Sequence, residues 1–268
     1  MGWGDEILAA GQAQRWYEAD PSRPVAICDQ RGRVRDHPIW QGNPAIASPA
    51  LVQSGVPVQR VTNAPGCRPY IVYPFTRETG WTFDQTFRAR DYVARIYLTE
   101  AELRRGLHAH ATYGPYVLIE PFTDHGNFLW HHQRWVALVE ACPDLTFVQH
   151  VHADSVRVPG THQERATFRE ACGLLLGARA YVRSESGLCH AAAALGVPTV
   201  TIWGGCMDAE VLGGYPLRVD IVDAGPGSPC GRWLRCQHCR DAMARLSVDE
   251  VASALRLALQ MGAEVASC

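Results

Sequence analysis

The chain has 268 residues, of which 47% are hydrophobic, 19% charged and 9% aromatic. This length and apolar content allow two compact domains with sizeable cores and exclude an intrinsically disordered chain. Lys and Arg together number 25 against 27 Asp and Glu, which gives a formal net charge of -2. A general nucleic-acid-binding protein is more basic, so we expect no non-specific binding to duplexes.

Targeting and membrane signals are missing from the sequence pattern. No apolar run approaches the roughly 18–20 residues of a membrane span, so we expect no transmembrane segment. The first residues, MGWGDEILAAGQAQ, carry an acidic pair and no basic region, unlike a secretory signal peptide. These features predict a cytoplasmic protein.

The first 115 residues have an irregular pattern. Residues 5–17 predict a helix, and three short apolar runs predict strands at 24–29, 57–63 and 70–74. Between the first two strands, residues 33–49 are rich in Pro and Gly and predict a long loop. A charged helical run at 99–111 leads into the second half of the chain.

From Tyr116 onward, strand and helix signals alternate. Strands are predicted at 116–122, 145–151, 180–186, 199–205 and 219–223, and helices at 131–141, 161–178, 188–196 and 247–262. The last helix opens with a capping box, Ser247-x-x-Glu250. Alternation of this kind predicts an α/β fold with a parallel sheet covered by helices on both faces. Two lobes, 1–112 and 113–268, fit the pattern better than a single sheet.

A strand, a tight turn and a small-residue helix follow one another at 181–205. The turn Ser184-Glu185-Ser186-Gly187 places the positive end of a helix at the carboxyl edge of the sheet, where phosphates and diphosphates bind. Gly187 allows close backbone approach, Ser186 offers a hydroxyl, and His190 lies one turn into the helix. The alternative is an ordinary turn with a Ser cap and a core histidine.

This stretch resembles the donor-binding segment of family 9 glycosyltransferases, the heptosyltransferase-like enzymes, whose usual form is Asp-Thr-Gly-x-x-His-x-x-Ala-Ala-x-x-x-Pro-Thr. Three further segments agree in order. Gly2-Trp3-Gly4-Asp5 resembles the family's Gly-x-Gly-Asp loop, and Glu120–Trp135 resembles the start of its second domain. Cys230, Cys236, Cys239 and the following residues 243–251 resemble its Cys-rich C-terminal stretch. The strand that usually precedes the Gly-x-Gly-Asp loop has no counterpart before Gly2.

The resemblance implies a GT-B architecture of two Rossmann-like lobes with parallel sheets, the N-terminal one reduced. Residues 1–112 would form the acceptor-side lobe and 113–268 the nucleotide-sugar-binding lobe. The implied activity is inverting transfer of a sugar from a nucleoside-diphosphate donor, an ADP-heptose-like molecule, to an acceptor hydroxyl. Asp5 occupies the position of the family's catalytic base, although an N-cap role is the alternative from the residues alone. No metal is needed when helix ends and side chains hold the leaving diphosphate.

Candidate donor-binding residues follow from the turn and the resemblance; they are Gly4, Thr123, Glu185, Ser186, Gly187 and His190. Asp154, just after a predicted strand, is the candidate partner of a donor ribose, and a solvated loop residue is its alternative. The family's usual Asn-Lys-x-Trp reads Asn127-Phe128-Leu129-Trp130 here, so the phosphate-binding Lys is missing. His125, His131 or Arg183 could supply the charge.

Three cysteines lie close together as Cys230-x5-Cys236-x2-Cys239. The CxxC spacing suits two ligands of a tetrahedral zinc ion, and Cys206 or His238 could complete a structural site. Reduced free thiols are the alternative. His150-x-His152 also suggests a metal hydrolase, but no HExxH-like motif accompanies it.

Two other functions remain open from the sequence. The first is a non-catalytic nucleotide-sugar-binding protein with the same fold, which the missing Lys favours. The second is an epimerase or hydrolase acting on a nucleotide sugar in the same cleft.

Overall fold

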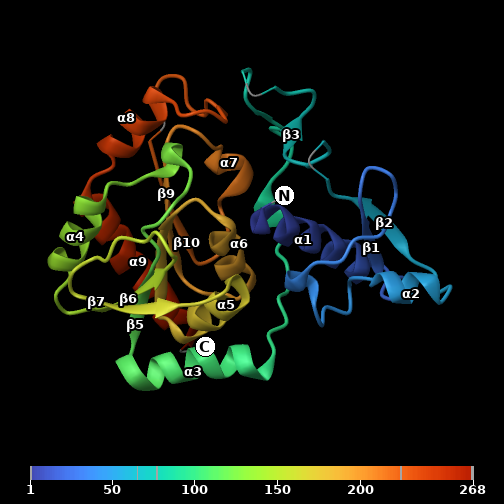
Figure 1. Ribbon diagram of the computed structural model, residues 1–268, viewed down its shortest axis with the longest axis horizontal. Helices are drawn as coiled ribbons and strands as arrows, with labels where there is room; N and C mark the ends of the chain where they lie inside the picture. The colour runs from blue at the N-terminus through green and yellow to red at the C-terminus, as the bar shows by residue number, and fades with distance from the viewer. Residues whose placement is uncertain (1, 65, 77, 224, 267–268) are drawn as a thin grey trace.

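Six parallel strands form the main sheet of the computed structural model, which describes residues 2–64, 66–76, 78–223 and 225–266 (Figure 1). Their order is β10-β9-β8-β5-β6-β7, with all neighbouring pairs parallel. The strands are β5 (Tyr116–Ile119), β6 (Thr146–Val151), β7 (Thr161–Arg165), β8 (Ala180–Ser184), β9 (Thr199–Trp203) and β10 (Arg218–Val222). This is the doubly wound order, and its switch point lies between β5 and β8, where such sheets bind ligands.

The helices cover both faces of this sheet, as the alternating pattern predicts. One hydrophobic cluster joins Tyr116 and Leu118 of β5 to α5 (Phe168–Gly177) and α6 (Gly187–Ala194). A second cluster joins Val117 and Ile119 of the same strand to α4 (His132–Ala141) and α9 (Val248–Ala266). Because neighbouring strand residues point to opposite faces, one apolar strand supplies both cores.

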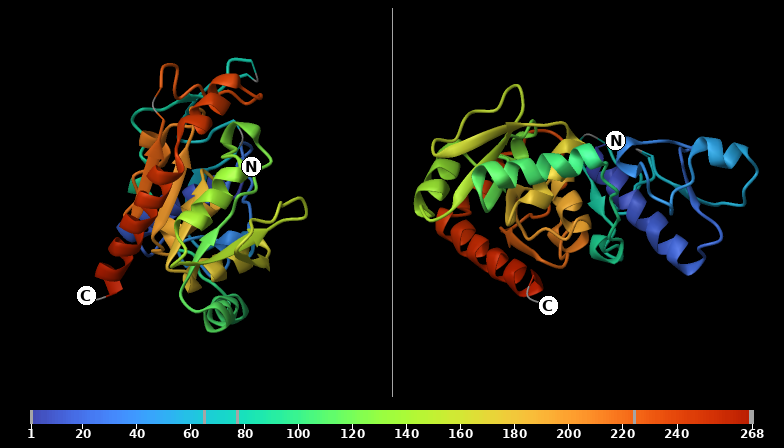
Figure 2. Two further views of the ribbon diagram at one scale, coloured as in Figure 1. Left: turned by 90° about the vertical axis from the view of Figure 1, so that its left-hand side faces the viewer. Right: turned by 90° about the horizontal axis from the view of Figure 1, so that it is seen from below.

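The first lobe is smaller, and its described residues form two sheets of two strands each. β1 (Val25–Cys28) and β2 (Gln59–Thr62) pair in parallel, and β3 (Ile71–Val72) and β4 (Thr82–Phe83) pair antiparallel. Its other elements are α1 (Trp3–Ala19), η1 (Pro38–Trp40), α2 (Pro49–Gln53) and η2 (Ala89–Asp91). Figure 2 shows this lobe beside the six-stranded unit, with α1 next to the latter. The prediction of two lobes with a reduced N-terminal one is therefore confirmed.

The prediction of one helix over 161–178 is wrong. Residues 161–165 form β7, which pairs with β6 at the sheet edge, and the helix α5 begins only at Phe168. Thr167 starts it with a capping box, because its hydroxyl accepts from Glu170 N and the Glu170 carboxylate accepts from Thr167 N. The capping box predicted at Ser247 and Glu250 is present. Six short helices of the described residues were not predicted: η1, α2 and η2 of the first lobe, and η3 (Gly126–Phe128), α7 (Ala209–Leu212) and α8 (Gln237–Arg245) of the second.

Helix α3 (Glu100–Tyr113) connects the two parts and packs against α5. The two backbones approach closely where glycines face each other: a Cβ on Gly106 would lie 2.1 Å from Gly173 O. In space α3 therefore lies with the second lobe, although the sequence-based division at 112 groups it with the first. None of the helices in the described ranges combines the length and hydrophobicity needed to cross a bilayer.

Candidate active site between the lobes

A cavity of about 470 Å³ lies between the lobes at the switch point of the main sheet. The first lobe contributes the start of α1 and the segment around β3, and the second contributes the ends of β5 and β8 and the start of α6. Seven of the predicted site residues line it: Gly4, Asp5, Thr123, Glu185, Ser186, Gly187 and His190. Segments about 180 residues apart in sequence thus meet at one place.

Two helix N-termini converge on this cavity. A Cβ on Gly187 would lie 2.9 Å from Gly4 N, so this contact needs glycine at 187, while a Cβ on Gly4 would lie 3.2 Å from His190 Cδ2. Ser186 is the N-cap of α6, but its side chain makes no hydrogen bond to the helix backbone. Cys189 N donates to Ser186 O at 3.1 Å, so the amides of the first turn that are available to an anion are those of Gly187 and Leu188, in the field of two helix dipoles.

The Asp5 carboxylate lies at the floor of the cavity and is 9% exposed. It accepts a hydrogen bond from Gly2 N at 3.0 Å; Gly2 is the N-cap of α1 and Asp5 its third residue, so the alternative that Asp5 is itself the N-cap is wrong, although its carboxylate does cap the Gly2 amide. Tyr70 OH also donates to Asp5, and the Arg68 guanidinium lies 3.3 Å from Asp5 Oδ2. Capping and a chemical role are compatible, because these contacts fix the carboxylate in one orientation facing the cleft.

Tyr70 keeps its proton beside this carboxylate. Burial raises the pKa of Tyr70 well above its usual value, and the negative charge of Asp5 raises it further. Arg68 and Tyr70 were missed by sequence reasoning. They lie in the irregular segment before β3, which carries no motif, and reach Asp5 across more than 60 residues.

His190 is held from both sides in the wall of the cavity. It is 3% exposed, its Nδ1 lies 2.8 Å from Tyr215 OH, and its Nε2 lies 3.5 Å from Glu185 Oε1. The Tyr215 hydroxyl is buried, which raises its pKa. The imidazole therefore has a fixed orientation towards the start of α6.

Asp154 does not line this cavity. It lies at a separate cavity of about 110 Å³ beside Trp130 and Trp135. Thr123 lines both cavities, so the two are neighbours. The structure thus brings together seven of the eight predicted donor-side and catalytic residues and leaves Asp154 apart.

A buried charge network supports the sheet edge next to the cleft. Glu120, directly after β5, accepts from Tyr181 OH at 2.8 Å, and its carboxylate lies 3.1 Å from Arg183 Nε. The other carboxylate oxygen contacts His152 Nε2 and lies 3.3 Å from His150 Nδ1. Burial opposes the charge of Glu120, but Arg183 and the two histidines outweigh it and hold the pKa of Glu120 far below its usual range.

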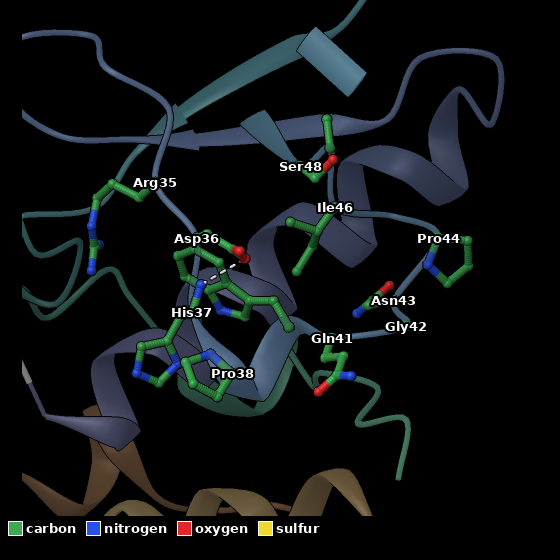
Figure 3. Close-up of a pocket in the computed structure, with 12 residues that line it drawn as sticks. Arg35, Asp36, His37, Pro38, Gln41, Gly42, Asn43, Pro44, Ile46 and Ser48 are labelled. Carbon is green, nitrogen blue, oxygen red and sulfur yellow. Dashed lines mark hydrogen bonds between the residues drawn. The ribbon is translucent and has the colours of Figure 1, made fainter. Parts of the chain in front are cut away.

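A pocket of about 740 Å³ in the first lobe is separate from the cleft (Figure 3). It is formed by residues 35–48, the loop rich in Pro and Gly. Its cation Arg35 is paired with Glu6 at 2.5 Å, and its His37 accepts from Ile39 N at the start of η1. These side chains are occupied by contacts with α1 and within the loop, so we place the candidate site in the cleft.

The sequence model of glycosyltransferase family 9 (heptosyltransferase) matches residues 86–223, which is more than half of the chain. The chain belongs to this family. The match spans the main sheet from before α3 to the end of β10, including the turn at Glu185–Gly187. No curated protein sequence shows significant similarity to the chain.

Solved structures of family 9 glycosyltransferases have the same fold over nearly the whole chain. The glycosyltransferase family 9 protein from Veillonella parvula DSM 2008 is similar with a TM-score of 0.68 at 13% identity, covering 97% of this chain and 95% of that one. Escherichia coli ADP-heptose lipopolysaccharide heptosyltransferase II gives 0.58 at 14% identity, with 97% and 96% covered. The fold of this family 9 glycosyltransferase is therefore GT-B.

A third similar structure contains a metal. The iron-containing dodecameric glycosyltransferase TibC from enterotoxigenic E. coli H10407 gives a TM-score of 0.61 at 15% identity, covering 97% of this chain and 74% of that one. A structure of TibC with ADP-D-beta-D-heptose gives 0.54 at 14% identity, covering 90% and 77%.

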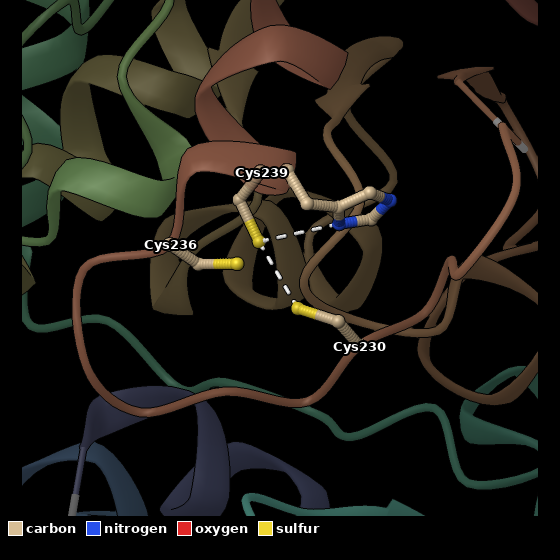
Figure 4. Close-up of side chains that lie close together, drawn as sticks. Cys230, Cys236 and Cys239 are labelled. Atoms are coloured by element: carbon tan, nitrogen blue, oxygen red, sulfur yellow. Dashed lines mark hydrogen bonds between the residues drawn. The ribbon is translucent and has the colours of Figure 1, made fainter.

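In this family 9 glycosyltransferase, the three predicted cysteines form a cluster with His238 (Figure 4). One ligand atom from each of Cys230, Cys236, His238 and Cys239 lies within 4.8 Å of the others. His238 Nε2 lies 3.2 Å from Ser228 Oγ, which leaves Nδ1 facing Cys239 Sγ at 4.0 Å. Three thiols and one oriented imidazole suit a tetrahedral zinc or iron ion.

The chain segment that carries this cluster also covers the cleft. Trp233 lines the cavity, and Gly231 O accepts from Trp81 N of the first lobe at 2.8 Å. Buried Asn127 donates to Arg232 O and Leu234 O, both at 3.0 Å. The segment 230–236 is thus a bridge between the candidate metal site and the candidate active site.

Proposed function

We propose that this family 9 glycosyltransferase moves a sugar, with inversion, from a nucleoside-diphosphate donor resembling ADP-heptose to an acceptor hydroxyl. The observation that carries the proposal is that the Asp5 carboxylate and the open N-terminus of α6 share one cavity between the lobes. The structure of TibC with ADP-D-beta-D-heptose supports the choice of donor. The acceptor lies on the side of the first lobe, residues 1–112.

The donor diphosphate lies at the start of α6 in this proposal. The Gly187 and Leu188 amides and the Ser186 hydroxyl, which does not cap its own helix, donate to the phosphate oxygens. Gly4 and Gly187 leave room for close approach, and Thr123 donates from the end of β5. Glu185 and His190 orient the sugar side, and Asp154 is a partner of the ribose if the donor extends past Thr123.

The chemical step then needs one base and one stabilised leaving group. The acceptor oxygen attacks the anomeric carbon as the bond to the β-phosphate oxygen breaks, and Asp5 takes the hydroxyl proton. A single displacement from the face opposite the leaving group inverts the anomeric carbon. The helix ends and side chains at α6 carry the negative charge of the departing diphosphate, so the proposed step uses no catalytic metal.

We assign the Cys230, Cys236, His238 and Cys239 cluster to a structural metal, zinc by preference. Bound there, the ion would fix the bridge 230–236 over the cleft by coordination bonds. Elemental analysis of the purified protein distinguishes zinc from iron.

Nucleotide binding tests the donor site first. We expect ADP to raise the melting temperature more than UDP, GDP or CDP do, because a ligand that binds the native state stabilises it by mass action. Ser186→Trp fills the space at the start of α6 and should abolish the shift. If no nucleoside diphosphate binds at millimolar concentration, the proposed function is wrong.

Asp5→Asn tests the base. We expect turnover of ADP-heptose with a panel of hydroxyl acceptors to fall by about 10²–10⁴-fold, while ADP affinity stays within a few fold. Asp91→Asn, an acidic residue of η2 away from the cavity, is the matched control. Binding without turnover in the unaltered protein indicates a non-catalytic nucleotide-sugar-binding protein, and sugar release without acceptor indicates a hydrolase.

A further inference from the structure

The sequence contains no lysine: every one of its 25 basic residues is arginine. A nucleoside diphosphate carries two or more negative charges, and helix ends supply only partial positive charges to meet them. The cation that faces the phosphates in this chain must therefore be an arginine or a charged histidine. Among the described residues that line the cleft, the guanidinium groups are those of Arg68 and Arg183.

Arg68 is already used on the acceptor side. Its Nη2 lies 3.3 Å from Asp5, and its guanidinium lies over the Trp81 ring, 5.7 Å from the ring centre. Both contacts hold it in the first lobe, next to the proposed base.

Arg183 lies where a diphosphate would be bound. It is the fourth residue of β8, at the switch point of the sheet, and it is three residues before the N-cap of α6. It lines the cleft cavity and also an adjoining cavity of about 480 Å³ over the ends of β5 and β6. A ligand that spans both cavities must pass its side chain.

The Nε and Nη2 edge of the Arg183 guanidinium is held by neighbouring residues, and Nη1 on the other edge is available to a ligand. Nη2 donates to Phe122 O at 2.9 Å, and Nε lies 3.1 Å from Glu120 Oε2. In the part of the chain that the structure describes, neither Nη1 nor the buried Nε makes a hydrogen bond, and Nε is held by the ion pair alone. The side chain is 13% exposed, so the open edge belongs to the cavities and not to bulk solvent.

The Glu120 carboxylate holds the Arg183 guanidinium in its orientation. The carboxylate is 2% exposed and is itself held by Tyr181 OH and by contacts with His150 and His152. Such a buried network of hydrogen bonds and ion pairs presents a cation with little reorganisation when the ligand arrives. The guanidinium also matches phosphate oxygens better than an ammonium group does.

The spacing of Glu120, His150 and His152 also suits a metal ion, because one ligand atom from each lies within 4.8 Å of the others. Arg183, however, already lies 3.1 Å from the same carboxylate. A divalent ion would bring a second cation against a buried guanidinium with one carboxylate between them, which is strongly unfavourable. The arrangement favours Arg183 as the cation of this site.

We propose that Arg183, oriented by Glu120, binds the diphosphate of the donor in place of the lysine that family 9 usually carries in the loop after β5. The inference rests on the proposed function, because it requires a nucleoside-diphosphate donor in the cleft.

Binding of ADP and adenosine by calorimetry tests this assignment. We expect Arg183→Met to weaken ADP binding about 10- to 100-fold and adenosine binding by less than threefold, because the lost contact is to phosphate. Arg105→Met is the matched control, since Arg105 is paired with Glu164 at 2.5 Å, far from the cleft. The control should bind ADP as the unaltered protein does.

Placing the lost positive charge at another position of the cavity gives a more specific test. Phe128 lines the cleft in the loop where the family usually has lysine. We expect Phe128→Lys to restore most of the ADP affinity in the Arg183→Met background. Because Arg183→Met leaves Glu120 buried without its cation, the double variant Glu120→Gln/Arg183→Met serves if the single variant does not fold.

The outcomes separate the two proposals. If the unaltered protein binds no nucleoside diphosphate, the proposed function fails. If it binds ADP and Arg183→Met binds equally well, or loses ADP and adenosine to the same extent, the role of Arg183 in phosphate binding is overturned.

Discussion

At the scale of single residues, Gly187 has the least room in the candidate site. A Cβ there would lie 2.9 Å from Gly4 N and 3.0 Å from Trp3 Cβ, and the first of these atoms is backbone. The start of α1 must then move away from α6, at a cost typical of overpacking, about 1–3 kcal/mol. We expect Gly187→Ala to lower the melting temperature and to weaken ADP binding about tenfold in calorimetry.

Gly126→Ala is the control for this change. Gly126 lies in η3 and does not line the cleft, and its Cβ would meet only the Arg235 side chain, at 3.6 Å or more. It should leave stability and ADP affinity nearly unchanged. Equal losses in both variants would show that the contact between α1 and α6 does not shape the site.

Local backbone requirements decide which residues of the site can be recognised from the sequence. Ser186 and Gly187 are recognisable because a tight turn before a helix needs small residues, and Gly4 because residues 2–5 resemble the Gly-x-Gly-Asp loop of the family. Arg68 and Tyr70 have no such local requirement. Their role depends on a tertiary contact with Asp5, which no short sequence window contains.

At the scale of elements, the segment 230–236 connects a candidate metal site to the cleft. We expect about one equivalent of zinc or iron per chain, and we expect Cys236→Ser to lose it. Loss of the ion should lower the melting temperature, because metal binding free energy contributes directly to folding. It should also weaken ADP binding, since Trp233 of this segment lines the cavity.

Cys67→Ser provides the control for this prediction, because Cys67 is a half-buried cysteine outside the cluster. It should retain the metal and the melting temperature. Metal content that is the same in both variants, or absent from the unaltered protein, would contradict a structural metal and would favour free thiols.

The elements themselves differ in how well the sequence predicts them. β5 and β9 are buried at every position, and β8 at every position except Arg183, so their pattern is that of strands covered on both faces. β7 reads THQER and buries only Thr161, because it lies at the edge of the sheet. Its polar pattern merges with the helix that follows, and only pairing with β6 distinguishes the two.

At the scale of the whole molecule, Arg169 of α5 connects the two lobes. Its side chain is 8% exposed, and it binds both carboxylate oxygens of Glu102, at 2.6 and 2.7 Å. It also donates to Pro38 O in the first lobe and to Tyr97 O in the connecting segment, at 2.7 and 2.8 Å. The Arg169 guanidinium thus connects α5 to three other segments: η1, the residues just before α3, and α3 itself.

This arrangement makes the geometry of the cleft depend on a contact outside it. Beside Arg169, the Trp3 ring of α1 stacks on Phe168 with ring centres 4.1 Å apart. Because α1 also carries Asp5, movement of α1 relative to α5 changes the distance between the proposed base and the start of α6. Stability of the lobe contact and binding in the cleft should therefore change together.

We expect Arg169→Met to reduce the unfolding free energy by about 2–3 kcal/mol, because charged hydrogen bonds are lost and two carbonyls lose their donor. Amide hydrogen exchange should accelerate in residues 36–42 and at the start of α1, and ADP affinity should fall. Arg256→Met is the control, since Arg256 pairs with Asp144 in an exposed ion pair of little energetic weight. If Arg169→Met loses stability without faster exchange at the lobe contact, Arg169 stabilises α5 alone and the lobes are held together by other contacts.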